Sequence, residues 1–149
     1  MDADSQSQEI KPRIDADLTR TGSWGDRLLH RELTQKILGA AFAVHRELGS
    51  GFLEKVYVTA LIYELIDRGL SAIAESEIPV SYKGRLVGNY FADILIEGKI
   101  LCEVKAIRAL ANEHQAQLLH YLTATGIPVG LVLNFGTPSL QFKRLAKTK

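Results

Sequence analysis

Apolar residues recur at helical spacing over two stretches in the first half of the chain. Residues 33–48 form the first stretch, which ends at the break Gly49-Ser50-Gly51. Residues 53–68 form the second, and Gly69 follows them. Because residues three and four apart share one face of a helix, both stretches are predicted to be helices with one buried side. The predicted inward residues of the second helix are Leu53, Val56, Tyr57, Ala60, Leu61 and Leu65.

The middle of the chain consists of apolar runs joined by short turns that contain glycine. Residues 78–82, 86–96 and 100–104 are rich in β-branched, aromatic and other apolar side chains, as strands are. They are separated by Lys83-Gly84-Arg85 and by Glu97-Gly98-Lys99, and short turns with glycine favour hairpins. The three runs are therefore predicted to form an antiparallel meander.

The last part of the chain predicts a helix and then strands. Asn112 is the predicted N-cap of this third helix, with Gly126 as its stop and Pro128 just beyond. The apolar run of residues 129–135 predicts a buried strand, and residues 140–143 predict a further strand at the edge of the sheet. The predicted order is ααβββαβ, with the edge strand added at the end.

Asp93 and Glu103 interrupt the apolar strands of the hairpin of residues 91–104, and Lys105 follows directly after it. If its turn centres on Gly98, Asp93 lies opposite Glu103, and alternation places Lys105 on the same face as Glu103. Two facing carboxylates repel each other, and a divalent cation such as Mg²⁺ removes that repulsion. The pattern predicts a metal site with a lysine beside it. The alternative is a cross-strand salt bridge, in which Lys105 neutralises one carboxylate on an exposed sheet face.

Two further segments stand on either side of this hairpin. Upstream is Gly51-Phe52-Leu53-Glu54-Lys55-Val56-Tyr57, and downstream is Gln115-Ala116-Gln117-Leu118-Leu119-His120-Tyr121. Together with the hairpin they resemble the GxxExxY family, a branch of the PD-(D/E)XK nuclease-like superfamily, over about residues 33–142. The resemblance implies an α/β (α+β) fold with a restriction-endonuclease-like core, in which helices flank a mixed central sheet. Ala92 stands where the superfamily's name has proline, a minor departure because the Asp93 carboxylate carries the chemistry.

The resemblance also implies an activity and a set of site residues. It implies an Mg²⁺- or Mn²⁺-dependent nuclease that hydrolyses phosphodiester bonds of nucleic acid, most of all DNA. Lys105 would position and activate the attacking water. The implied metal ligands are Glu54, Asp93, Glu103 and the carbonyl of Val104. The implied catalytic residues are Asp93, Glu103, Lys105, Gln117 and Tyr121.

Several of these residues have a structural explanation as well. A glutamate in the first turn of a helix, such as Glu54, complements the helix dipole. Tyr57 is expected to pack, with its hydroxyl available to bond a carboxylate. Gln115 competes with Gln117 for the role of the site glutamine, and either could belong to an ordinary polar helix face. We assign no catalytic or zinc-binding role to the histidines, because none has a partner at ligand spacing: His45, His114 and His120.

Composition bounds the remaining choices. The chain has 149 residues, 46% of them hydrophobic, which predicts one domain over residues 31–149 after a flexible leader at residues 1–30. A net charge of +1 provides no global attraction for nucleic acid, so binding must come from local basic residues. The single Cys102 excludes an internal disulfide and suits a reducing compartment. With no apolar run of membrane-spanning length, we expect a cytoplasmic protein without membrane partners.

Two other functions remain open at this level. The chain could keep the fold as a non-catalytic module that binds nucleic acid or regulates a partner. It could also hydrolyse another kind of phosphate ester. A domain of this size has little extra surface with which to bind a duplex. Whether the chain is a nuclease or a non-catalytic nucleic-acid-binding module, a homodimer or a partner protein is therefore expected.

Overall fold

The protein is described by a computed structural model over residues 29–147. The predicted leader, residues 1–30, therefore lies outside the described part except for its last two residues. The elements follow in the order α3 (Arg31–Leu48), α4 (Glu54–Asp67), β1 (Ala72–Tyr82), β2 (Arg85–Ile96), β3 (Ile100–Lys105), α5 (Asn112–Thr125), β4 (Val129–Asn134) and β5 (Gln141–Ala146). This confirms the predicted order and the α+β class.

The strands form one mixed sheet in the order β1-β2-β3-β4-β5. β1, β2 and β3 are antiparallel neighbours, as the two glycine turns predict. β4 lies parallel to β3, with α5 as the connection between them, and β5 returns antiparallel along β4. The apolar run at residues 129–135 becomes a strand buried along its whole length, because helices cover both of its faces.

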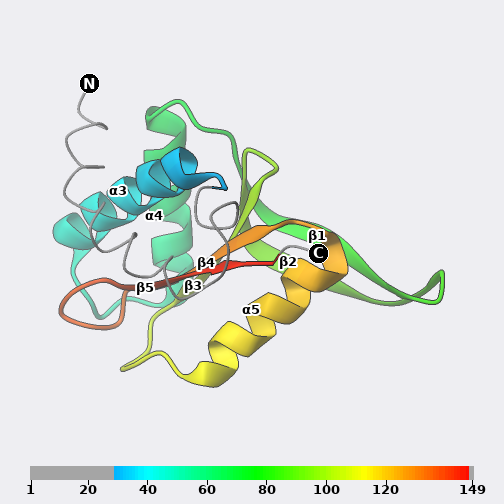
Figure 1. Ribbon diagram of the computed structural model, residues 1–149. Coiled ribbons are helices and arrows are strands. Elements are labelled where there is room, and N and C mark those ends of the chain that lie inside the picture. The colour runs from blue at the N-terminus through cyan, green and yellow to red at the C-terminus, as the bar shows by residue number, and fades with distance from the viewer. Residues whose placement is uncertain (1–28, 148–149) are drawn as a thin grey trace.

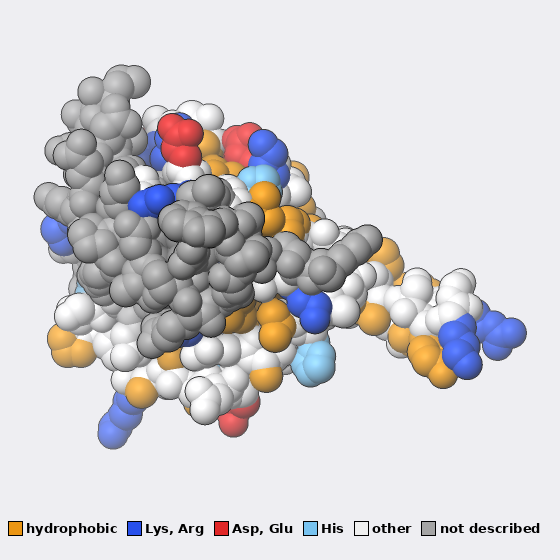
Figure 2. Space-filling view, viewed as in Figure 1, with side chains coloured by type: hydrophobic (Ala, Val, Ile, Leu, Met, Phe, Trp, Pro, Cys, Tyr) orange, Lys and Arg blue, Asp and Glu red, His pale blue; other side chains and the backbone are white. Residues whose placement is uncertain are grey.

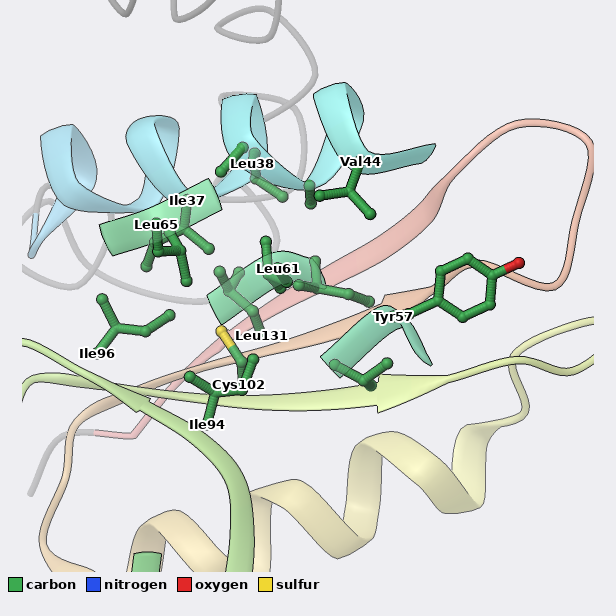
Figure 3. Close-up of a cluster of buried hydrophobic side chains, with 14 of the residues drawn as sticks. Ile37, Leu38, Val44, Tyr57, Leu61, Leu65, Ile94, Ile96, Cys102 and Leu131 are labelled. Atoms are coloured by element: carbon green, nitrogen blue, oxygen red, sulfur yellow. The ribbon is translucent and has the colours of Figure 1, made fainter. Parts of the chain in front are cut away.

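Figure 1 shows the three layers: α3 and α4 lie on one face of the sheet and α5 lies on the other. The larger hydrophobic cluster joins α3 and α4 to Ile94, Ile96 and Cys102 of the sheet, as Figure 3 shows. The smaller cluster joins Leu118 and Leu122 of α5 to the opposite face. β3 alternates between the two clusters, so Cys102 and Val104 point toward α4, while Glu103 and Lys105 point toward the α5 side.

A long hairpin of β1 and β2 projects from this body, and we call residues 78–91 the β1–β2 arm (Figure 1). Its turn is Lys83-Gly84, with φ values of 50° and 79°. Positive φ at both central residues is the geometry of a type I′ turn, whose twist suits a two-residue hairpin. The arm extends well past the point where α5 covers the sheet.

Three local predictions are wrong. β1 begins at Ala72 rather than Ile78. Residues 72–77 lack the apolar–polar alternation of a strand, but they belong to β1 because their backbone pairs with β2. The N-cap of α5 is Ala111, and Asn112 is already helical. Leu53 and Val56 are exposed, at 81% and 40%, because α4 begins at Glu54 and buries the narrower stripe of Tyr57, Leu61 and Leu65.

The two remaining fold expectations concern membranes and the cysteine. Over residues 29–147, no helix has the length and apolar character that a membrane crossing requires. Cys102 is fully buried and free in the larger cluster, where it serves as a small apolar side chain.

Candidate functional site

The site is built where β3 separates from β2. The two strands pair at Ile94–Cys102, Leu95–Leu101 and Ile96–Ile100, the register predicted from a turn at Gly98. Beyond Cys102, β3 pairs with β4, up to Lys105 and Asn134. The same register places Asp93 opposite Glu103 just where the backbones part, which leaves room between the strands for polar side chains.

Side chains of Asp93 and Glu103 bridge this gap. The Asp93 Oδ2 accepts a hydrogen bond of 2.8 Å from the backbone N–H of Val104. The backbone N–H of Asp93 lies 3.4 Å from the Glu103 Oε2. Each acidic side chain thus contacts the backbone of the opposite strand, and the two carboxylates converge as predicted.

Burial governs the charge of both carboxylates. Removal from water raises the pKa of Glu103 to about 7, and the neighbouring Asp93 contributes to the rise. Burial also raises the pKa of Asp93, against the hydrogen bond from Val104 and the charge of Lys105. A positive charge placed between them would favour the ionised form of both.

Lys105 lies on the same side of β3 as Glu103, and it is half-buried. Within residues 29–147 no ion pair joins Lys105 to Asp93 or Glu103, although its charge lowers the pKa of both. The face is therefore neither exposed nor closed by a cross-strand salt bridge, which argues against the alternative interpretation of the pattern. The ammonium remains available to a third group.

Asn134, which sequence reasoning did not single out, holds the segment after Lys105 in place. Its Oδ1 accepts hydrogen bonds of 3.0 Å from the N–H groups of Ile107 and Gly136. Its Nδ2 donates to the Ile107 carbonyl and to the Gln141 side chain, each at 3.0 Å. A polar residue at the end of an apolar strand was the available signal, but its partners come from three separate segments.

Glu54 approaches the site from α4. It lines a cavity of about 420 Å³ together with Lys55, Glu75 and Asp93. Glu103 does not line this cavity, and within residues 29–147 no three His, Cys, Asp or Glu side chains are grouped to hold a metal ion. The structure thus brings Asp93 close to Glu103 on one side and into a shared cavity with Glu54 on the other.

Glu75 is an acidic residue beside Asp93 that sequence analysis did not identify. The β1–β2 ladder pairs Ala74 with Ile94 and Ser76 with Ala92, so Glu75 lies opposite Asp93. Its φ of 51° is unusual for a residue with a side chain, and its charge raises the pKa of Asp93. A glutamate in a polar edge strand carries no sequence signal for such a place.

Tyr90 connects Glu103 to α5, and it too was missed. Its hydroxyl donates a hydrogen bond to the Glu103 Oε2. Its ring stacks on Tyr121, with 3.4 Å between centroids and 19° between planes. Burial and the adjacent Glu103 raise the pKa of the Tyr90 hydroxyl, so it stays a donor at neutral pH. Only the tertiary structure sets a β2 tyrosine against α5.

The two α5 residues named from sequence lie on this side of the molecule. Tyr121 reaches Glu103 through Tyr90; burial and the charge of Glu103 raise the pKa of its hydroxyl, and the side chain of Gln117 opposes that rise. Gln115 instead lines a separate cavity beside β5, with Gln141 and Lys143. The geometry favours Gln117 over Gln115 as the glutamine near Glu103.

Tyr57, His45 and His114 have structural partners. Tyr57 is buried and stacks on Phe135 at 4.7 Å, and its hydroxyl donates to the Gly49 carbonyl at 2.6 Å and accepts from the Phe52 N–H. Packing was predicted correctly, but the hydroxyl bonds backbone rather than a carboxylate. The His45 Nε2 lies 2.9 Å from the Thr137 carbonyl, and His114 accepts from the Ala111 N–H at the start of α5. His120 is exposed.

The donor set at the strand separation fits a hard divalent cation. Asp93 and Glu103 supply carboxylate oxygens from neighbouring strands. Burial raises the pKa of both, and a bound cation would favour their ionised forms. Oxygen ligands of this kind suit Mg²⁺ and Mn²⁺, and the Val104 carbonyl belongs to the same stretch of backbone.

Comparisons with known proteins identify the family and the fold. Residues 31–145 match a family model described as the PD-(D/E)XK nuclease superfamily. The solved structure of SSO0001 has a similar fold, with a TM-score of 0.52 and 20% identity over 64% of this chain. The match spans 50% of the length of that chain, so the likeness concerns the fold of about half of it. A search of curated proteins found no match.

Proposed function

The chain belongs to the PD-(D/E)XK nuclease superfamily and has its restriction-endonuclease-like fold; from this premise we propose that it is a divalent-metal-dependent nuclease that hydrolyses phosphodiester bonds of nucleic acid, with DNA as its substrate. One observation carries the proposal. Asp93 and Glu103 converge where β3 leaves β2, with raised pKa values and with no ion pair to Lys105 among the described residues.

Each site residue has a distinct part in this proposal. Asp93, Glu103 and the Val104 carbonyl would hold Mg²⁺ or Mn²⁺, and Glu54 would extend the site from the cavity that it shares with Asp93. When bound, the metal supplies positive charge that polarises the phosphate and offsets the charge developing on its oxygens. Its presence would also keep both carboxylates ionised.

Lys105 acts on the attacking water. The ammonium of this half-buried residue orients that water and attracts the phosphate. Tyr90 holds one oxygen of Glu103, and Tyr121 supports the Tyr90 ring. Gln117, whose side chain lowers the pKa of the Tyr121 hydroxyl, offers an amide to the water or to a phosphate oxygen.

The narrower family and the compartment are also part of the proposal. The segment Gly51 to Tyr57 and the Gln117–Tyr121 pair support membership of the GxxExxY branch. The single free Cys102 supports a cytoplasmic location, because a reducing compartment preserves a thiol.

The test is cleavage of end-labelled single- and double-stranded DNA with Mg²⁺ or Mn²⁺. Asp93→Asn, Glu103→Gln and Lys105→Met should each lower the cleavage rate by roughly a hundredfold or more, since each removes a metal ligand or the group that acts on water. Glu113→Gln, at an exposed acid of α5, is the matched control and should cleave as the wild type does. Glu54→Gln distinguishes two roles of this glutamate. If Glu54 only complements the helix dipole, the substitution lowers stability and leaves the cleavage rate unchanged. If Glu54 belongs to the site, cleavage becomes slower in a protein of unchanged stability.

Other outcomes would redirect the assignment. Wild-type cleavage by the Asp93→Asn protein would disprove the site. Tight binding of DNA without cleavage under either metal would favour the non-catalytic module. Hydrolysis confined to small phosphate esters would favour another hydrolase.

A further inference from the structure

Apart from Tyr90, the β1–β2 arm has no role in the site described above, although it projects from the body of the protein (Figure 1). From Ser81 to Asn89 every residue is exposed, on both faces of the hairpin. Tyr82, Leu86 and Val87 each expose 62% of their surface. Isolated apolar residues are common on surfaces, but a cluster on a projecting two-stranded ribbon indicates a binding surface.

The arm carries only one sign of charge. No aspartate or glutamate occurs between Glu77 and Asp93, whereas the turn region holds Lys83 and Arg85. Figure 2 shows basic side chains gathered at the end of the projecting arm, beside apolar ones. The Lys83 ammonium lies 5.3 Å from the centre of the Tyr82 ring, and the two side chains form a cation–π pair.

β2 connects this tip directly to the site. Leu86, near the tip, and Asp93 lie on the same strand, and at about 3.3 Å per residue they are roughly 23 Å apart along it. At about 3.4 Å per nucleotide pair, a nucleic acid that is bound at Asp93 and follows the arm meets the tip after roughly seven base pairs. A substrate only one or two nucleotides long would not reach it.

We propose that the β1–β2 arm is a nucleic-acid contact, in which Lys83 and Arg85 bind backbone phosphates away from the site while Tyr82 and Leu86 contact sugars and bases. The proposal rests on the proposed function, since the substrate that reaches the arm is the one bound at Asp93. A two-stranded ribbon fits the major groove of a duplex, and an aromatic ring beside a cation also suits an unpaired base. The partner is a polyanion because the arm offers cations and no acids.

Self-association is the main competing use of the arm. Two copies meeting arm to arm would bring four cations together with no acidic residue of either arm to compensate them. The edge that β1 presents is also interrupted, by Pro79 and by a register shift between Val80 and Ser81. Both features oppose pairing with a second β1 edge.

The experiment compares DNA binding and small-ester hydrolysis in two arm variants. Fluorescence anisotropy in EDTA, with 30-nucleotide single-stranded and 30-base-pair double-stranded DNA across a salt series, measures affinity without cleavage. Lys83→Ala with Arg85→Ala should weaken duplex binding and lower the slope of log K against log salt by nearly 2, about 0.9 for each phosphate that is no longer neutralised. Tyr82→Ser with Leu86→Ser should weaken binding and leave the slope unchanged.

The controls separate the arm from the site. Arg46→Ala with Lys147→Ala removes two exposed cations elsewhere and should leave affinity and slope as in the wild type. Hydrolysis of bis(p-nitrophenyl) phosphate with Mn²⁺ should have the same kcat and KM in the arm variants as in the wild type, because that ester cannot span from the site to the tip. Circular dichroism confirms that each variant is folded.

Three results would overturn the arm proposal. One is wild-type affinity and slope in the Lys83→Ala, Arg85→Ala protein. A second is a wild-type protein that hydrolyses the small ester but binds neither the single-stranded nor the double-stranded DNA. That result would disprove nucleic-acid binding by the arm and would still agree with phosphodiester hydrolysis at the site. A third is a dimer, seen by analytical ultracentrifugation, that the arm variants turn into monomers with unchanged DNA affinity.

Discussion

At the scale of single residues, the site depends on how Glu103 is held. One of its oxygens accepts from the Tyr90 hydroxyl and lies 3.4 Å from the Asp93 N–H. Both contacts stabilise the ionised carboxylate, while burial and the charge of Asp93 favour the neutral acid. Burial wins, so Glu103 titrates near neutrality when no cation is present, and small changes around it alter its charge at physiological pH.

Tyr90→Phe removes the hydroxyl that donates to Glu103 and should raise the pKa of that carboxyl further. A hydrogen bond to a charged group is worth about 1.5–3 kcal/mol, or roughly one to two pH units. The pKa is measured from the ¹³C shift of the Glu103 side-chain carboxyl in metal-free protein. Tyr63→Phe, at an exposed tyrosine of α4, is the control. An unchanged Glu103 titration in Tyr90→Phe would show that the hydroxyl does not control the carboxylate.

At the scale of elements, the separation of β3 from β2 and the loop after Lys105 position the site. The loop is held by Asn134 and by the close approach of Gly136. A Cβ added at Gly136 would lie 2.3 Å from the backbone N of Ile107 and 2.4 Å from its carbonyl oxygen. Backbone cannot yield to such a contact as a flexible side chain can, so only glycine fits there.

Gly136→Ala should therefore displace the loop that follows Lys105. We expect a loss of stability of about 1–3 kcal/mol, as for other overpacked positions. Hydrogen exchange at the Ile107 amide, which donates to Asn134, should become faster. Chemical denaturation measures the first effect, and exchange followed by NMR measures the second. Gly88→Ala is the control, since a Cβ there meets no atom within 4 Å; equal effects of the two substitutions would contradict this explanation.

At the scale of the whole molecule, the buried carboxylates make folding depend on pH. The pKa of Glu103 is about 7 in the folded protein against an ordinary value of 4.5. Between these values the folded chain binds a proton that the unfolded chain has released. The contribution of Glu103 to the free energy of unfolding is therefore present at low pH and is lost as pH rises toward 7.

The free energy of unfolding of metal-free wild-type protein, relative to Glu103→Gln, should fall by about 3 kcal/mol at most between pH 4.5 and pH 8. Mg²⁺ binds the ionised carboxylates, so adding it should raise the wild-type melting temperature more at pH 8 than at pH 5.5. Chemical denaturation in EDTA and thermal denaturation with Mg²⁺ measure the two effects. The Glu103→Gln protein should show little response to Mg²⁺; an equal response would place the metal elsewhere.

The sequence by itself determined the order of elements and the meeting of Asp93 with Glu103. Periodicity distinguishes helices from strands locally, and a short turn at Gly98 imposes the register of its own hairpin. Lys105 follows from alternation along a single strand. These inferences succeed because each depends on residues that are close in the chain.

The tertiary structure alone decided what surrounds those residues. Tyr90 meets Tyr121, Asn134 meets Ile107, and Glu75 lies beside Asp93 because strands and helices distant in sequence pack together. The raised pKa values have the same origin, since burial is a property of the assembled layers. No local pattern records such contacts, because the free energy that selects them comes from packing and desolvation over the whole fold.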